Sequence, residues 1–338
     1  MIPIFKEKLR IEKSAQYSGK LSLKGIHKLK ESHYWIVNVP LDGEAPKQYI
    51  KAYFYYKNCP RKSSPKYWDG YYAKFGGKSY PHESVIEYTI NQIGVGLGLT
   101  MNETKLAVIN SQLRFLSKDF LKRNERLIHG IEILAEYFED KDFIDEINED
   151  KKTRREFLTF DVIESAIEHV YPNQSEELME GLIKMISFDA LAGNNDRHFY
   201  NWGVIGNTEK IEDKGVKFAP IYDSSRGLFW NYTQDRIVKF YNQNQKSEAQ
   251  LKAYLKKSEP RFSFEQNPKA NHFQLIEFLI AYKKNYKEVI SYLCSKEKEE
   301  KVLKHLNEVI FFRLSKERRS LMASALKFRF NKIRSYLS

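Results

Sequence analysis

A short polar stretch near the middle of the chain carries the residue types that phosphoryl transfer requires. Residues 193–202 read Gly-Asn-Asn-Asp-Arg-His-Phe-Tyr-Asn-Trp, and Asp223 follows after two short apolar runs. In this reaction one Asp accepts or orients the hydroxyl proton of the acceptor, while an Asn and a second Asp hold the metal that neutralises the triphosphate. The spacing predicts Asp196 as the catalytic base or aligner, and Asn201 and Asp223 as metal ligands. The alternative is a polar helix end followed by a solvated hairpin.

A lysine and a glutamate upstream would complete the set of groups that a kinase needs. Lys74 lies in an aromatic run that predicts a strand over 71–75, and Glu87 lies in a helix predicted to begin at Pro81. In kinases a strand Lys grips the nucleotide phosphates and a helix Glu holds that Lys in place. Either residue alone would suit an exposed surface. Their order along the chain, ahead of the polar stretch, favours a nucleotide site.

These segments resemble the HipA-like Ser/Thr kinases, the toxin-kinase group of bacteria. The likeness rests on Gly-Asn-x-Asp-Arg-His-x-x-Asn-Trp-Gly at 193–203, Ala-Lys-Phe at 73–75 and Pro-His-Glu-Ser-Val-Ile-Glu-Tyr at 81–88, and it extends from about residue 60 to about residue 330. Ordinary protein kinases order the loop His-Arg-Asp instead. The resemblance implies transfer of the ATP γ-phosphoryl group to a Ser or Thr hydroxyl of a protein, with Mg²⁺ bridging the phosphates. The chain would be a compact family member with a toxin or effector role.

The resemblance also points to a phosphate-binding loop that precedes the strand of Lys74. Ser63 and Ser64, in the basic segment 61–66, would bind ATP and become sites of autophosphorylation, although the segment lacks the glycine of the family loop. A basic surface turn explains the same residues equally well. The glycines of 94–98 follow a predicted helix rather than a strand, so we interpret them as the helix end and not as a phosphate loop.

Four further residues take roles from the same resemblance. Phe115 and Lys118, where the last N-terminal strand crosses to the second half of the chain, would contribute to the ATP site beside the adenine. Arg197 and His198 would hold the catalytic loop in shape, since a lone His is more often a satisfied structural residue than a catalytic one.

Composition limits the cellular setting. The chain has 338 residues, enough for two lobes, and 42% of them are hydrophobic. The two cysteines, Cys59 and Cys294, suit neither a disulfide framework nor a zinc site, which favours a reducing compartment. No apolar run approaches the ~20 residues that span a bilayer, and the N-terminus shows no signal-peptide pattern. A cytoplasmic location is therefore expected, with secretion as an effector left open.

The predicted elements divide the chain into two parts. Strands are predicted over 34–39, 49–55, 71–75, 105–110 and 112–117. Helices are predicted over 81–93, 131–139, 155–169, 175–191, 247–257, 272–293, 297–311 and 315–336. A charged linker is expected over 141–155, and polar loops over 231–245 and 241–250. The fold class is α+β, a two-lobed protein-kinase-like fold with a β-rich N-lobe over 1–120 and a mostly helical C-lobe over 121–338.

Two other functions remain open. A phosphoinositide-type lipid kinase shares Asp-Arg-His-x-x-x-Asn, and the net charge of +12 suits an anionic membrane. A non-catalytic pseudokinase or DNA-associated regulator would also use that charge, although the presence of every motif group argues against it. The resemblance adds a DNA-binding antitoxin as a candidate partner, and the charge leaves direct binding to nucleic acid open.

Overall fold

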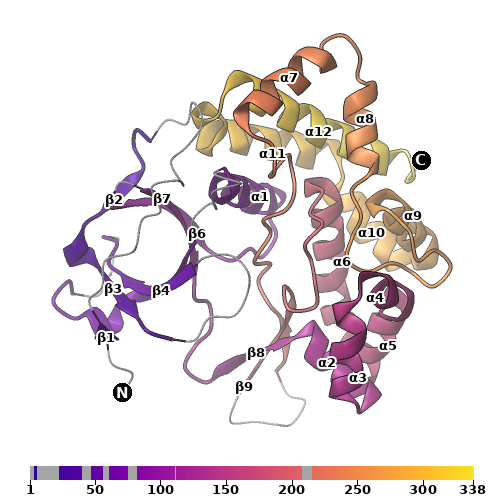
Figure 1. Cartoon of the computed structure of the whole chain (residues 1–338). Helices are drawn as coiled ribbons and strands as arrows, with labels where there is room; N and C mark the ends of the chain where they lie inside the picture. Colours follow the sequence, from indigo (N-terminus) through magenta and orange to yellow (C-terminus); the bar gives the residue numbers. More distant parts are fainter. Residues whose placement is uncertain are drawn as a thin grey trace.

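The computed structural model describes residues 4–5, 23–39, 47–55, 61–74, 82–110, 112–207 and 215–338. Within these ranges strands dominate the first part of the chain and helices the second, and the two parts lie side by side (Figure 1). The predicted α+β architecture, with a β-rich N-lobe and a mostly helical C-lobe, is confirmed.

In the described part of the N-lobe, seven strands form a curled sheet with the order β1-β3-β4-β5-β7-β6-β2 (Figure 1). Neighbouring strands are antiparallel except β2 and β6. Side chains alternate along β5: Tyr71 and Ala73 are fully buried in the core of the sheet, so Tyr72 and Lys74 point to the other face. The strands are β1 (Ile4–Phe5), β2 (His27–Leu29), β3 (Tyr34–Val37), β4 (Lys47–Ala52), β5 (Asp69–Lys74), β6 (Thr104–Ile109) and β7 (Gln112–Lys118).

Helix α1 (Glu83–Leu97) lies between the sheet and the C-terminal helices (Figure 1). Its apolar residues recur at helical spacing and are buried. The helix ends where Gly98 adopts the left-handed conformation with φ 80°. The glycines of 94–98 are therefore the helix end, as predicted. Gly96 packs closely on α11 (Lys296–Val309), where an added Cβ would lie 3.1 Å from Val302 Cα.

Among the residues described by the structure, a second sheet has three strands in the order β10-β9-β8. It consists of β8 (Glu125–His129), β9 (Gly203–Asn207) and β10 (Lys217–Phe218). Strand β8 continues from the crossover after β7, and β9 begins directly after the 193–202 stretch. Gly203 lets β9 approach β8, because a Cβ there would lie 2.1 Å from Ile128 O. The sheet thus fixes the polar stretch beneath the junction of the two lobes.

The C-lobe is built around α6, whose inner residues are almost all buried. Its helices are α2 (Gly130–Phe138), α3 (Lys141–Glu149), α4 (Lys151–Phe157), α5 (Phe160–Val170), α6 (Ser175–Ala192), α7 (Gln234–Asn244), α8 (Ala249–Lys256), α9 (His272–Tyr282), α10 (Lys284–Leu293), α11 and α12 (Lys316–Arg334). Short 3-10 turns lie at η2 (Glu31–His33), η3 (Pro65–Tyr67) and η4 (Phe311–Arg313).

Four predictions of local structure were wrong. The expected linker over 141–155 forms α3 and most of α4, because the side chains of Asp140 and Asp150 cap their first turns and Ile144 is buried. The expected polar loops over 231–245 and 241–250 contain α7, capped by Thr233, and the start of α8. The single helix expected over 272–293 breaks into α9 and α10, because Lys283 adopts an extended conformation.

Candidate active site

The catalytic-loop candidate begins at a helix end that only glycine fits. Gly193 ends α6 in the left-handed conformation with φ 66°, and an added Cβ would lie 2.4 Å from Arg329 Nη2. The next residue, Asn194, is fully buried and donates from Nδ2 to Asp189 Oδ1 at 2.9 Å. Its Oδ1 accepts from the backbone N–H of Asp196 at 3.3 Å. The end of α6 therefore sets the direction in which Asp196 leaves the helix.

Arg197 ties this loop to the segment that carries Asp223. Its buried guanidinium pairs with Asp189 through Nε at 2.8 Å and Nη2 at 3.0 Å. Nη1 also donates to the carbonyls of Asn201 at 2.8 Å and Tyr222 at 2.5 Å. Burial opposes the charge, but Asp189 outweighs it and raises the pKa of Arg197. These contacts suit the scaffold role that the resemblance implied for Arg197.

His198 and Asn201 complete the loop. The Nδ1 of His198 accepts from the N–H of Tyr200 at 3.3 Å, and burial lowers the pKa of the imidazole although Asp196 opposes the shift. A neutral His198 therefore shapes the loop. Asn201 Nδ2 donates to Asp196 O at 2.8 Å, which orients the amide, and its Oδ1 is an acceptor of the kind that can bind a cation.

Lys74 joins the two lobes through its ammonium group. Nζ lies 2.8 Å from Glu87 Oε1 on α1 and 2.7 Å from Asp223 Oδ1. Burial disfavours the ammonium, but Asp223 and Glu87 outweigh it and raise the pKa of Lys74. Burial conversely raises the pKa of Glu87 to about 7, because Lys74 only partly offsets it and Asp223 adds repulsion. The predicted pair of Lys74 and Glu87 is thus brought together.

Asp223 meets the chemical requirements of a metal ligand. Its backbone is left-handed with φ 49°, a strained conformation for a residue with a side chain and one that concentrates at functional sites. Burial would raise the pKa of Asp223, but Lys74 outweighs it and lowers the pKa, so the carboxylate is ionised. The side chains of Asp223 and Asn201 both carry hard oxygen atoms of the kind that Mg²⁺ prefers. In the described residues no group of three or more His, Cys, Asp or Glu forms a metal cluster, and a kinase ion takes its remaining ligands from phosphates and water.

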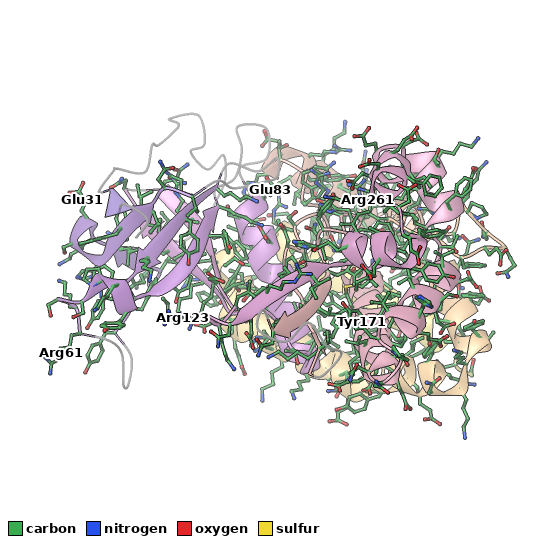
Figure 2. The ribbon with its side chains drawn as sticks, turned by 90° about the horizontal axis from the view of Figure 1, so that it is seen from below. Glu31, Arg61, Glu83, Arg123, Tyr171 and Arg261 are labelled. Atoms are coloured by element: carbon green, nitrogen blue, oxygen red, sulfur yellow. The ribbon has the colours of Figure 1, made fainter. Side chains whose placement is uncertain are left out.

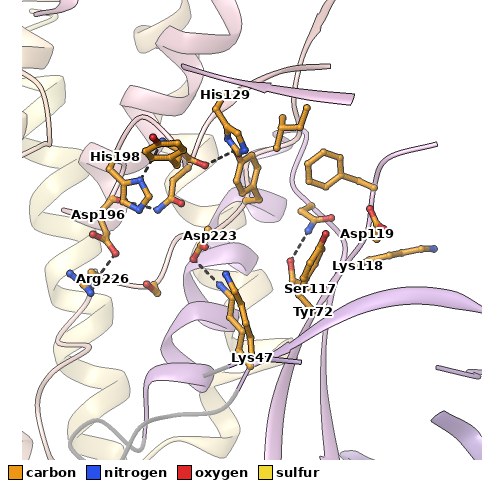
Figure 3. Close-up of a pocket in the computed structure, with 18 of the residues that line it drawn as sticks. Lys47, Tyr72, Ser117, Lys118, Asp119, His129, Asp196, His198, Asp223 and Arg226 are labelled. Atoms are coloured by element: carbon orange, nitrogen blue, oxygen red, sulfur yellow. Dashed lines mark hydrogen bonds and ion pairs between the residues drawn. The ribbon is translucent and has the colours of Figure 1, made fainter. Parts of the chain in front are cut away.

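Lys74, Asp196, His198, Asn201 and Asp223 line one cavity of about 750 Å³ between the lobes (Figure 3). Asp196, His198 and Asp223 lie on one side, and Tyr72 and Lys118 on the other. The lining residues are Lys47, Tyr72, Lys74, Glu83, Asn102, Ser117, Lys118, Asp119, Phe120, Leu121, Leu127, His129, Asp196, His198, Tyr200, Asn201, Tyr222, Asp223, Ser225, Arg226 and Arg261. The volume suits a nucleotide-sized ligand.

The crossover between the lobes forms one wall of the cavity. Lys118 lies in this wall as predicted, and its ammonium pairs with Asp69 and Glu103 at 3.2 Å each. Asp119 holds the wall in shape, because its carboxylate accepts from Tyr49 OH at 2.9 Å. Phe115 lies beneath the cavity rather than in its lining, 2% exposed, with its ring 5.8 Å from Lys74 Nζ.

Ser63 and Ser64 are not brought to the cavity. They precede β5 at Asp69, whereas Lys74 lies at the opposite end of that strand, ~17 Å away at the rise of an extended chain. Figure 2 shows the neighbouring Arg61 at the end of the N-lobe remote from Glu83 and Arg261. Lys47, the first residue of β4, lines the cavity instead. Residues 40–46, which precede β4, lie outside the described ranges.

Two arginines that the sequence did not single out contact the carboxylate of Asp196. Arg261 Nη2 lies 2.5 Å from Oδ1, and Arg226 Nε lies 3.1 Å from Oδ2. Arg226 has a weak sequence signal, because it follows Asp223 by three positions. Arg261 has none, since only the packing of the C-lobe brings it to a loop 65 residues earlier.

The fold is that of two-lobed kinases, with a cavity at the lobe junction. The chain belongs to the family described as the HipA-like C-terminal domain, whose model matches residues 41–312. The Helicobacter pylori proinflammatory kinase CtkA has a similar structure, with a TM-score of 0.67, 17% identity, and 95% of each chain covered. HipA of Shewanella oneidensis MR-1, in complex with HipB and operator DNA, is similar at a TM-score of 0.50 and 14% identity over 95% of this chain and 66% of that one. No curated protein matches the sequence.

None of the helices in the described ranges combines the length and apolar character that crossing a membrane would require.

Proposed function

We propose that this protein is an ATP-dependent Ser/Thr protein kinase of the HipA type. One observation carries the proposal: Lys74 contacts both Glu87 and Asp223 at the cavity that also holds Asp196. This is the arrangement in which a kinase grips the triphosphate, positions its metal ions and receives the acceptor hydroxyl. Membership of the HipA-like family supports the same conclusion.

The lining of the cavity suggests how ATP would bind. Phe120, Leu121 and Leu127 offer an apolar surface for the adenine at the lobe crossover. Lys74 and Lys47 offer positive charge for the phosphates. Mg²⁺, held by Asp223 and Asn201, would supply charge neutralisation to the phosphate oxygens.

Asp196 would act on the acceptor. The hydroxyl oxygen of a Ser or Thr forms a bond to the γ-phosphorus while the bond to the β–γ bridging oxygen breaks. The electron pair of that bond leaves with ADP, and the hydroxyl proton passes to the Asp196 carboxylate. Asp196 is buried but its carboxylate faces the cavity, which is where an acceptor side chain must enter.

The decisive experiment is mass spectrometry of the purified protein after incubation with ATP and Mg²⁺ and a mixture of bacterial proteins. Phosphoserine or phosphothreonine that appears with the wild type, and not with the Asp196→Asn variant, would support the proposal. A parallel arm offers phosphoinositide vesicles and labelled ATP. Phosphate transfer to lipid alone would assign the site to lipid kinases, and the absence of transfer in both arms would leave a pseudokinase.

We further propose a DNA-binding protein as a partner of the chain. The support is that the similar HipA structure contains HipB and operator DNA. The partner would be tested by co-purification of the chain with the product of an adjacent reading frame, followed by an operator-binding assay of the pair. DNA binding by the chain alone would contradict this assignment.

A further inference from the structure

The carboxylate of Asp196 lies between two guanidinium groups that come from different parts of the C-lobe. Arg261 Nη2 is 2.5 Å from Oδ1 and Arg226 Nε is 3.1 Å from Oδ2. Both arginine side chains line the cavity, and they are 26% and 30% exposed. Figure 3 shows Arg226 at the carboxylate of Asp196, on the same side of the cavity as Asp223.

The backbone around Arg226 is fixed against α6. Its carbonyl accepts from the N–H of Asn195 at 3.1 Å, which joins it to the catalytic loop. The next residue, Gly227, packs so closely that a Cβ would lie 2.6 Å from Ala192 O. The guanidinium lies over the ring of Trp230, at 5.4 Å from its centroid. Across the cavity it interacts with Glu83 on α1, whose pKa burial raises and Arg226 lowers.

Arg261 is presented by a segment that another buried arginine organises. Arg155 on α4 donates to the carbonyls of Pro260, Pro268 and Ala270 at 2.5, 2.8 and 2.7 Å. The neighbour Phe262 is buried at 2% exposure. Arg261 lies between these two anchored neighbours, and its side chain reaches the cavity. The packing of the neighbours therefore directs Arg261 toward Asp196.

Position and donor number give these arginines a role in the chemistry. A hydroxyl that passes its proton to Asp196 lies about 2.6–3.2 Å from the carboxylate, and the phosphorus it attacks lies about 3–3.5 Å further on. Groups in contact with that carboxylate are thus within reach of the phosphoryl oxygens. The ion pairs with Asp196 engage one nitrogen of each guanidinium, and a guanidinium has five N–H donors in a planar fork suited to phosphate.

We propose that Arg226 and Arg261 are catalytic residues that donate hydrogen bonds to the transferred phosphoryl group. The proposal rests on the kinase function proposed above. As the hydroxyl oxygen bonds to the γ-phosphorus and the bond to the bridging oxygen breaks toward ADP, negative charge spreads over the three remaining phosphoryl oxygens. The two guanidinium groups stabilise this charge with hydrogen bonds to those oxygens.

The test compares Arg226→Ala, Arg226→Lys, Arg261→Ala and Arg261→Lys with Arg123→Ala, an exposed arginine outside the cavity. Two quantities are measured: the turnover number, and the dissociation constant of Mg·ADP with and without aluminium fluoride. Aluminium fluoride mimics the phosphoryl group in the transition state of its transfer. We expect each Ala variant to lose about 100-fold or more in turnover. Each should bind Mg·ADP within about twofold of wild type yet lose the gain in affinity that aluminium fluoride gives. The Lys variants, which keep the charge without the fork, should lie between.

The Asp196→Asn background separates direct contact from mere support of Asp196. If the arginines contact the phosphoryl group, Arg261→Ala will still reduce the aluminium fluoride gain in that background. An unchanged gain there, or turnover within twofold of wild type in the single variants, would overturn the proposal. The binding measurement needs no acceptor, so it tests the role of the arginines even when the acceptor offered is the wrong one. A wild type that binds no Mg·ADP would refute the proposed kinase function, whereas Ala variants that keep the wild-type gain would refute only the role of the arginines.

Discussion

Lys74 and Asp223 are in direct contact, 2.7 Å apart, although 149 residues separate them in sequence. The same ammonium also forms an ion pair with Glu87, so one cation is shared by two buried or half-buried carboxylates. These ion pairs link the sheet, α1 and the segment after β10. The site is therefore assembled around a shared charge rather than around independent pairs. Loss of the lysine removes the partner of both carboxylates at once, while loss of Glu87 leaves one pair intact.

The first prediction follows from this sharing. Lys74→Ala should abolish phosphoryl transfer and lower the free energy of unfolding by about 3 kcal/mol, because breaking a buried ion pair leaves an uncompensated charge. Glu87→Gln should reduce turnover and stability less. Urea unfolding and a labelled-ATP assay measure both effects. Lys184→Ala, which removes an exposed pair with Glu180 on α6, is the control and should stay within about 0.5 kcal/mol of wild type. Equal effects of Lys74→Ala and the control would refute the shared-charge arrangement.

The second prediction separates the two aspartates. Asp196→Asn should abolish turnover and leave Mg²⁺-dependent binding of ATP near the wild-type value, because in the proposed mechanism this residue receives a proton and holds no metal. Asp223→Asn should abolish turnover and also weaken ATP binding in the presence of Mg²⁺. Titration calorimetry with and without Mg²⁺ distinguishes the two. Turnover at the wild-type level in either variant would refute its assignment.

The third prediction concerns acid stability. His272 is 1% exposed, and burial, together with Arg329 and Arg155, lowers its pKa to about 3. In the unfolded chain His272 binds a proton near pH 6.5, whereas in the folded chain it does not bind one at this pH. The contribution of His272 to the free energy of unfolding is therefore complete above about pH 6.5. It falls by about 1.4 kcal/mol for each pH unit below that value, until about pH 3. His272→Gln should therefore flatten the loss of unfolding free energy between pH 7.5 and pH 5. A slope equal to that of wild type would count against this origin.

The fourth prediction concerns autophosphorylation, which we propose at Ser63 or Ser64 with a fall in activity. Ser63 is exposed and Ser64 half-buried, at the end of β5 opposite Lys74. The transfer must then occur between two molecules, so its initial rate should rise with the square of protein concentration. The added phosphate would not repel bound ATP in the cavity directly. Its negative charge would act instead on the basic residues of the segment 61–66 that surrounds it. An Asp196→Asn chain mixed with an active Ser63→Ala/Ser64→Ala chain should become phosphorylated. Phosphate on neither serine after prolonged incubation would end the idea.

The fifth prediction concerns α1. Lys298 on α11 is buried, and its ammonium donates to the carbonyl of Leu97 at the end of α1 at 2.7 Å. Nearby, His305 contacts Gln92 of α1 at 2.9 Å. Lys298→Met should lower the free energy of unfolding by about 1–3 kcal/mol and reduce turnover by loosening Glu87. Lys301→Met on the exposed side of α11 is the matched control. Turnover unchanged in Lys298→Met would show that α11 does not support Glu87.

Sequence reasoning succeeded where residue type, local element and chain order coincide. Lys74 on a strand, Glu87 on the next helix and Asp196 at a helix end each carry a local signal, and their order limits the ways in which they can meet. It failed where position depends on packing. Arg261 reaches Asp196 only because Arg155 organises a distant segment. Ser63 is predicted at the nucleotide site because it is close to Lys74 in sequence. The extended strand β5 nevertheless separates the two residues in space.

The short helices show a different limit. The stretch 141–155 is rich in charge, which led to the prediction of a linker, yet Ile144 and Ile147 are buried and two aspartates cap its helices. Two apolar residues three positions apart lie on the same face of a helix, and they suffice to pack one turn of that helix against the core. The average composition of the stretch does not reveal the spacing of these two isoleucines. Their burial is a property of the folded chain.

The docking of α1 on α11 also bears on the order in which the proposed nucleotide site can assemble during synthesis. The helix that holds Glu87 spans residues 83–97, and the helix against which it rests spans 296–309. A chain still on the ribosome holds the lysine, the glutamate and both aspartates long before it holds their support. The contact between α1 and α11 therefore forms only after the segment that carries α11 has been synthesised, and α11 supports α1 within one chain as a separate subunit would within a complex.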